Sequence, residues 1–458
     1  MVSGMNSPSQ PVSGFRNYRW IICALLFFST TCNYMDRQVI SYLKEFFCRA
    51  HVDGGFGWTN TDFSYLTSFF TGFYAGVTIL AGWVIDKIGT KAGLAISLIL
   101  WSIFGILNAF VGPLLKMHIL VRSAFAVGEA GNFPASIKTV AEWFPKRERA
   151  LATAIFNSGS NAGAMIAAIL VPWCMIHFGD QLGWKMAYII TGVIGFPWLI
   201  FWFWLYNPPS QHKGLTPAEY QYIHIDDETP ADAQAGDTTK KVSWLQLFRY
   251  RQLWAFFAGK FMTDGIWWFY LFWLPDYLQK QFNMGKAQIM LPTFIVYGVA
   301  IVGSIYGGSI PMTLIKRGMP VYRARTTTML LIAICPLAVL FTQYFGNVEH
   351  FKQFAPILAV AMICIGATAH QAWSANIFTT VSDMFPKKAV GSVTGIGTMS
   401  GGIGGVIVQL ISGRLNDIFK ATPQTAYLIM FVICAFSYLA AWLVMKALVP
   451  RHEPITDL

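Results

Sequence analysis

The sequence predicts an all-α membrane protein of twelve membrane-spanning helices arranged in two halves. Three observations predict it: the composition, the spacing of long apolar runs and a short internal repeat. Of the 458 residues, 55% are hydrophobic and only 12% are charged, and the mean hydropathy is +0.48. A soluble globular protein carries about 25% charged residues. The apolar excess therefore has to be covered by lipid.

Twelve apolar runs follow one another along the chain, each near the length of about 20 residues that a spanning helix needs. In the first half they cover residues 20–47, 62–86, 90–112, 116–141, 149–177 and 184–206. In the second half they cover residues 251–279, 288–315, 324–345, 353–383, 389–415 and 423–449. We therefore expect an N-terminal six-helix bundle over 1–206, a polar cytoplasmic linker with one surface helix over 207–250, and a C-terminal six-helix bundle over 251–458.

An internal repeat supports the division into halves. Residues 144–166 align without gaps on residues 385–407, with seven identities. Shared loop composition is the alternative explanation, but both segments begin just before the fifth span of their half, which favours duplication. Two parallel six-helix halves related by an axis along the membrane normal place a substrate site between them near the midplane.

The basic residues predict the orientation. Connections on the side of the N-terminus carry 20 Lys and Arg, whereas those on the other side carry nine. Cytoplasmic connections hold the excess of positive charge, so both termini and the linker are expected in the cytoplasm. The formal charge of +11 is then a topological feature and does not indicate nucleic-acid binding. We expect no cleaved signal peptide and a multi-pass protein of the plasma membrane, the inner membrane in a bacterium.

Several function classes lack their motifs. The seven Cys lie mostly in apolar runs without a CxxC pair, and neither GxxxxGK[ST] nor HExxH occurs in the sequence. An ATP-driven pump and a zinc protease would need these motifs. We therefore expect no cofactor, no metal site and no catalytic residue.

Four ionisable residues lie inside predicted spans of the first half: Asp36 and Arg37 in the first, Arg122 and Glu129 in the fourth. Each charge costs roughly 2.5–3.5 kcal/mol at the bilayer centre, so these residues should face one another or a wet cavity. Arginine binds a carboxylate through two parallel hydrogen bonds. A carboxylic acid shielded from water can take up a proton near neutral pH. The four residues thus predict a site for an anion and a proton, and the alternative is a set of structural ion pairs between helices.

The seventh span carries a different set of side chains. Lys260 and Asp264 are one helical turn apart and can neutralise each other. Trp267, Trp268 and Tyr270 lie well inside the span, where their rings offer a stacking surface to a sugar. Contact with lipid is the alternative role for these aromatic residues.

The internal repeat pairs further polar residues. Glu129 aligns with His370, which is followed by Gln371, and Asn157 aligns with Thr398. The second half thus has neutral polar groups where the first has an acid, and these groups are candidates for substrate contacts. A structural hydrogen bond is an equally good reading of the lone His370.

Two stretches resemble a known family. The motif GxxxDKxGTK is formed by Gly82, Asp86, Lys87, Gly89, Thr90 and Lys91. It resembles the motif between the second and third helices of major facilitators, whose acid and bases latch the cytoplasmic gate. Residues 128–163 resemble the anion:cation symporter branch of that superfamily. Residues 260–275 most resemble its proton-coupled hexuronate transporters.

This resemblance implies the major facilitator fold and the following roles. Substrate contacts are expected at Arg37, Arg122, Tyr74, Asn157, Trp267, Trp268, Tyr270, His370, Gln371 and Thr398. Proton coupling is expected at Asp36 and Glu129, and gating at Asp86, Lys87, Lys91 and Arg149.

The expected function is proton-coupled import of a sugar acid, glucuronate or galacturonate, by alternating access in a monomer. Other organic anions such as galactonate or glucarate, a passive anion channel and a transporter-like receptor are the alternatives.

Overall fold

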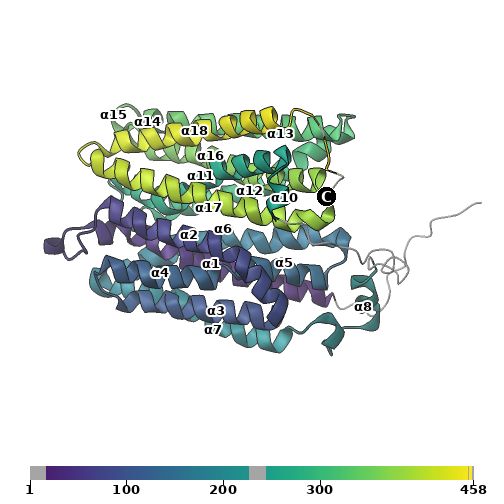
Figure 1. The fold of residues 1–458 in the computed structure, drawn as a ribbon. Coiled ribbons are helices and arrows are strands. Elements are labelled where there is room, and N and C mark those ends of the chain that lie inside the picture. Colours follow the sequence, from purple (N-terminus) through teal and green to yellow (C-terminus); the bar gives the residue numbers. More distant parts are fainter. Residues whose placement is uncertain (1–16, 226–243, 452, 456–457) are drawn as a thin grey trace, which may run out of the picture.

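A computed structural model describes residues 17–225, 244–451, 453–455 and 458. The helices run side by side in two layers, one from each half of the sequence (Figure 1). Residues 226–243 of the predicted linker lie outside the described residues, and the described part of the linker holds one short helix, α8 (Pro217–Ile223). The twelve predicted spans are confirmed.

The N-terminal layer contains the first six spans. Its helices are α1 (Tyr18–Cys48), α2 (Asn60–Ile88), α3 (Thr90–Leu107), α4 (Leu115–Glu129), α5 (Asn132–Trp143), α6 (Lys146–His177) and α7 (Gly179–Leu205). Short 3-10 turns follow at η1 (His51–Asp53), η2 (Asn108–Phe110) and η3 (Pro209–Gln211).

The C-terminal layer contains the other six spans. Its long helices are α11 (Arg251–Phe282), α12 (Met290–Lys316), α13 (Val321–Ile334), α16 (Ala355–Met384), α17 (Lys387–Ile418) and α18 (Pro423–Leu448). Shorter elements are α10 (Trp244–Leu247), η4 (Cys335–Phe341), α14 (Thr342–Phe345), α15 (Val348–Phe351) and η5 (Lys352–Phe354).

The fourth span is broken into α4 and α5. Pro134 has no N–H for the carbonyl of Ala130, so a regular helix cannot continue through this point. Gly131 bridges the break, and an added Cβ there would collide with Ser97 of α3. The chain therefore turns where α4 packs most closely on α3, and Glu129 is the last residue of α4.

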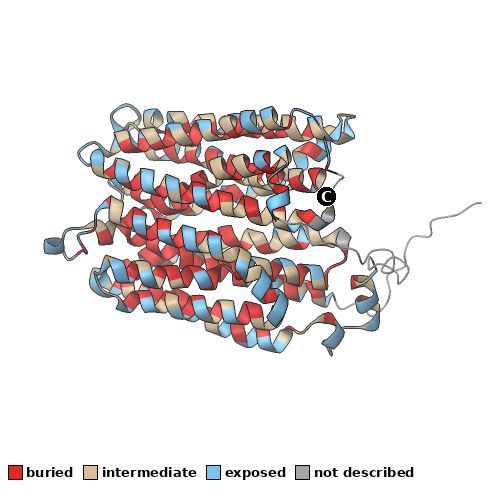
Figure 2. Cartoon of the chain, viewed as in Figure 1, coloured by how far each residue is buried: buried red, intermediate tan, exposed pale blue. Residues whose placement is uncertain are grey.

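Nine helical segments among the described residues are long and apolar enough to cross a membrane by themselves. The other three spans are α1, the α4 and α5 pair, and α11. These are the spans that carry Arg37, Glu129 and Asp264. Buried residues gather between the helices, and many exposed ones lie on the outer surfaces (Figure 2). The outer residues include large apolar side chains such as Trp204, which is 74% exposed, as expected of a surface that meets lipid.

The two faces of the bundle need names. The linker face carries the start of α1, the α2–α3 turn and the segment after α7. The distal face carries the α1–α2 connection (residues 49–59) and the α17–α18 connection (residues 419–422).

The two layers meet along α2 and α17. The hydroxyl of Thr67 lies 3.2 Å from Oε1 of Gln409, and an added Cβ at Gly402 would collide with Ala75. Closer to the linker face the seam ends, because an added Cβ at Gly76 or Gly395 would meet no described atom within 4 Å. The layers are therefore in contact toward the distal face and separate toward the linker face.

Candidate functional site

The centre of the site is a buried ion pair between the first and fourth spans. Nε of Arg37 lies 3.0 Å from Oε2 of Glu129, and their side chains are 1% and 0% exposed. Arg122 donates from Nη2 to the backbone carbonyl of Arg37 at 2.6 Å. Three of the four predicted charges thus meet at one depth, as expected from their cost in lipid.

The ion pair leaves polar atoms without a partner. Nη1 of Arg122, Oε1 of Glu129 and both carboxylate oxygens of Asp36 are buried and have no hydrogen-bond partner among the described residues. Buried polar atoms normally find a partner. These atoms can therefore receive a proton or a ligand without losing an existing bond.

Asp36 lies apart from the guanidinium groups. It forms no ion pair among the described residues, and its neighbours include Thr191 of α7 and Trp101 of α3. Because successive residues of a helix point about 100° apart, Asp36 faces the interior of the N-terminal layer. Arg37 faces the other layer.

Aromatic rings enclose Arg37. Its Cζ lies 4.3 Å from the ring centroid of Tyr34, 4.4 Å from that of Tyr74 and 5.3 Å from that of Trp268. The ring of Phe70 is 5.5 Å away. A cation over an aromatic face is stabilised electrostatically, most strongly when it is shielded from water. Since Trp268 belongs to α11, this aromatic cage spans both layers.

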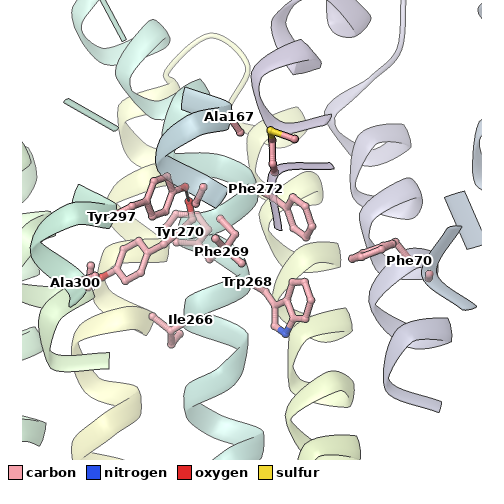
Figure 3. Packing of buried hydrophobic residues seen from close by; sticks show 14 of the residues in the cluster. Phe70, Ala167, Ile266, Trp268, Phe269, Tyr270, Phe272, Tyr297 and Ala300 are labelled. Atoms are coloured by element: carbon pink, nitrogen blue, oxygen red, sulfur yellow. Dashed lines mark hydrogen bonds between the residues drawn. The ribbon is translucent and has the colours of Figure 1, made fainter. Parts of the chain in front are cut away.

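The three predicted aromatic residues of α11 do not form one platform. Figure 3 shows Trp268 on the side of α11 that faces Phe70, whereas Tyr270 points toward Tyr297. Trp267 stacks on His370, with ring centroids 5.0 Å apart and planes 5° apart. Only Trp268 therefore contacts the Arg37 cage.

The remaining predicted contacts are less defined. Nδ1 of His370 lies 2.8 Å from the hydroxyl of Tyr438, so this histidine has the structural hydrogen bond expected in its alternative role. The Thr398 hydroxyl donates to the carbonyl of Thr394 within its own helix. Asn157 and Gln371 are half-buried. None of these four residues makes a hydrogen bond or ion pair with the Arg37 and Glu129 pair among the described contacts.

The predicted gate residues lie together on the linker face, and their bonds stay within the N-terminal half. Lys138 of α5 pairs with Asp86 at 2.8 Å. Lys91 bonds Asn207 at 2.9 Å, and Arg149 bonds the carbonyl of Phe144 at 2.9 Å. Nζ of Lys87 lies over the ring of Trp83.

A second charged cluster, absent from the sequence-based expectation, joins the halves at the distal face. Nζ of Lys44 in α1 lies 2.7 Å from Oδ2 of Asp276 in α11, and these side chains are 1% and 4% exposed. Lys280 reaches the same carboxylate at 2.9 Å. Lys44 also donates to Oδ1 of Asn60 at 2.8 Å.

Asp417 of α17 completes this cluster. One carboxylate oxygen accepts the backbone N–H of Asn60 at 2.9 Å, and the other accepts that of Thr61 at 2.7 Å. These are the first two residues of α2, where unpaired N–H groups and the helix dipole favour an anion. The C-terminal half thus caps a helix of the N-terminal half. The distal cluster is defined here as Lys44, Asn60, Thr61, Asp276, Lys280, Asp417.

Comparisons with known proteins agree with this arrangement. A family model described as Major Facilitator Superfamily matches residues 26–409. The hexuronate transporter of Escherichia coli (strain K12) is 29% identical over 433 residues, which cover 94% of this chain and 95% of that protein. The D-galactonate transporter of Escherichia coli O6:H1 is 26% identical over 430 residues, which cover 92% and 95%.

Solved structures show the same fold. The crystal structure of a D-xylose-proton symporter aligns with a TM-score of 0.72 at 14% sequence identity, covering 96% of this chain and all (100%) of that one. At this identity the likeness concerns the fold alone. Together with the family match over most of the chain, it leads to one conclusion: the chain belongs to the Major Facilitator Superfamily and is a membrane transporter, not an enzyme.

Proposed function

We propose that this protein is a proton-coupled symporter that imports a sugar acid with one carboxylate, a hexuronate such as glucuronate or galacturonate. The observation that carries the proposal is the buried pair of Arg37 and Glu129. The relatives named for hexuronate and D-galactonate support the substrate class.

The ion pair couples the proton to the anion. With the site empty, Glu129 neutralises Arg37. When Glu129 takes up a proton, the guanidinium loses its partner, and an uncompensated buried charge is costly. A substrate carboxylate then replaces Glu129 as the partner of Arg37, with the free Nη1 of Arg122 beside it. Proton and anion therefore enter together, and the charge of the site stays constant.

Asp36 is the second proton acceptor in this proposal. It adjoins Arg37 in sequence, so a change in its charge acts on the same turn of α1. The backbone carbonyl of Arg37 accepts from Arg122, which links this turn to the fourth span.

The bundles 1–206 and 251–458 move as the two bodies of an alternating-access cycle in a monomer. Both termini and the 207–250 linker lie in the cytoplasm, so the linker face is cytoplasmic. In this assignment the distal cluster closes the outer gate, and the separated ends of α2 and α17 give access from the cytoplasm. The bonds of Asp86 and Lys91 within one half suit an open inner gate.

The decisive experiment compares Glu129→Gln with wild type in reconstituted vesicles. Glutamine mimics the protonated acid permanently, so the variant should exchange hexuronate in counterflow but fail to accumulate it under an imposed pH gradient. Glu142→Gln is the matched control, because Glu142 accepts bonds from Thr90 and Tyr206 within the N-terminal half, and it should still accumulate substrate. Uphill uptake by Glu129→Gln would refute Glu129 as the coupling acid. Wild-type vesicles that only equilibrate substrate would indicate a channel, and binding without uptake a receptor.

A further inference from the structure

A second buried ion pair lies in the C-terminal half, near the central site. Nζ of Lys260 is 2.7 Å from Oδ2 of Asp264, one turn along α11, and the side chains are 6% and 19% exposed. Phe378 of α16 lies under the ammonium group, with its ring centroid 4.5 Å from Nζ. The mechanism proposed above does not use this pair.

The pair lies on the stripe of α11 that leads to the Arg37 cage. Lys260, Asp264 and Trp268 are spaced by four residues, and the ring of Trp268 is the C-terminal contact of Arg37. Four residues of helix rise about 6 Å. Asp264 is therefore one turn from the cage, a separation comparable with the length of a six-carbon acid.

Close packing fixes the position of the Asp264 carboxylate. An added Cβ at Gly401 of α17 would collide with Oδ2 of Asp264, and one at Gly405 would lie 2.7 Å from Cδ1 of Trp268. The neighbouring Gly402 packs against Ala75 of α2. Asp264 is thus held beside the seam between the two halves, while it keeps part of its surface exposed.

We propose that Asp264 is a specificity-determining residue that excludes sugar diacids. Its carboxylate occupies the position that a second substrate carboxylate would take, and it neutralises the only cation that such a group would reach on this stripe, Lys260. A diacid held by Arg37 would bring its second carboxylate against Asp264, and two like charges in a site shielded from water repel strongly. A hexuronate presents hydroxyl groups there, and a carboxylate accepts hydrogen bonds from hydroxyls.

The test measures binding to the purified full-length protein, with galacturonate as the monoacid and galactarate as the diacid. Wild type should bind galacturonate more tightly. In Asp264→Asn the ammonium of Lys260 loses its partner and gains the second carboxylate of galactarate. The ratio of the galactarate Kd to the galacturonate Kd should then fall about tenfold, the size of one charge-assisted hydrogen bond.

Two further variants separate this proposal from a structural role. Lys260→Met leaves Asp264 without its cation and should weaken both acids, galactarate more. The double variant Lys260→Met with Asp264→Asn carries no charge at either position and should lose the gain for galactarate. An unchanged ratio in Asp264→Asn, or a gain that persists in the double variant, overturns the proposal.

The inference rests on the proposed function, and the two fail differently. If wild type binds neither acid, the assignment to sugar acids is wrong and the diacid filter falls with it. If wild type binds galacturonate but the ratio does not respond to Asp264, the filter alone is wrong.

Discussion

Lys44 of α1 and Asp276 of α11 form an ion pair of 2.7 Å between the two halves, and both side chains are almost completely buried. Asp276 also pairs with Lys280 and accepts a hydrogen bond from the hydroxyl of Tyr427. One carboxylate thus collects three donors at the distal face. The halves can separate there only if these bonds break.

We predict that Asp276→Asn opens the distal face. Losing one partner of a buried ion pair costs about 3–5 kcal/mol because the other charge stays buried. Spin labels at Val52 and Val348, both exposed on the distal face, should report a longer distance by double electron–electron resonance. Glu45→Gln is the control, since Glu45 pairs with Arg49 inside the N-terminal half. Identical distance distributions in Asp276→Asn and wild type would contradict the role of the pair as a gate.

Asp417 should contribute to the same closure through the end of a helix. Replacing an N-capping side chain by Ala typically costs about 0.5–2 kcal/mol. Asp417→Ala should therefore lower the melting temperature and lengthen the distance between the two labels. Asp62→Ala removes a cap of α2 that lies within one half, where Asp62 and Thr59 form a capping box. It should lower the melting temperature only. A longer distance in Asp62→Ala as well would show that fraying of α2 is the cause.

Arg37→Lys should lose most substrate binding although the charge is kept. A lysine ammonium cannot make two parallel bonds to a carboxylate. It also loses the flat stacking of guanidinium between Tyr34 and Tyr74. We expect Kd to rise at least about tenfold, the equivalent of roughly 1.4 kcal/mol, in a titration that follows tryptophan fluorescence. Wild-type affinity in this variant would exclude the guanidinium as a ligand.

Adjacent tryptophans of α11 should behave differently. Trp268→Ala removes the C-terminal wall of the Arg37 cage, so affinity should fall by the equivalent of about 0.5–2 kcal/mol, the range of a cation over an aromatic ring. Trp267→Ala removes a ring that stacks on His370, so its main effect should be on thermal stability. Quenching by substrate should disappear in Trp268→Phe and persist in Trp267→Phe. The reverse pattern would place the substrate on the His370 side of α11.

Most of the fold could be predicted because lipid imposes a fixed length on every span. The same constraint revealed the central site: a charge such as Arg37 or Glu129 in the middle of an apolar run is expensive, so its presence indicates a partner. Lys260 and Asp264 were found by their spacing along one helix. These features can be recognised from local sequence.

The distal cluster could not be predicted in this way. Lys44 and Asp276 lie near the ends of their spans, where charged residues are normally solvated, and Lys44 was counted among the basic residues of a connection. Their burial results from contact between helices more than 200 positions apart in sequence. The rotation of α11 was equally inaccessible, since only neighbouring helices decide whether Trp267 or Trp268 faces Arg37.

The four central charges have a consequence for the energy source. The formal charges of Asp36, Arg37, Arg122 and Glu129 sum to zero, and one proton with one monoanion leaves that sum unchanged. Moving an elementary charge through 100 mV is worth about 2.3 kcal/mol, but a neutral set does no electrical work. Under the proposed stoichiometry both the loaded and the empty carrier would cross the membrane potential without responding to it. Uptake should then follow the pH gradient alone, at the same rate whether a potassium diffusion potential is imposed on the vesicles or abolished.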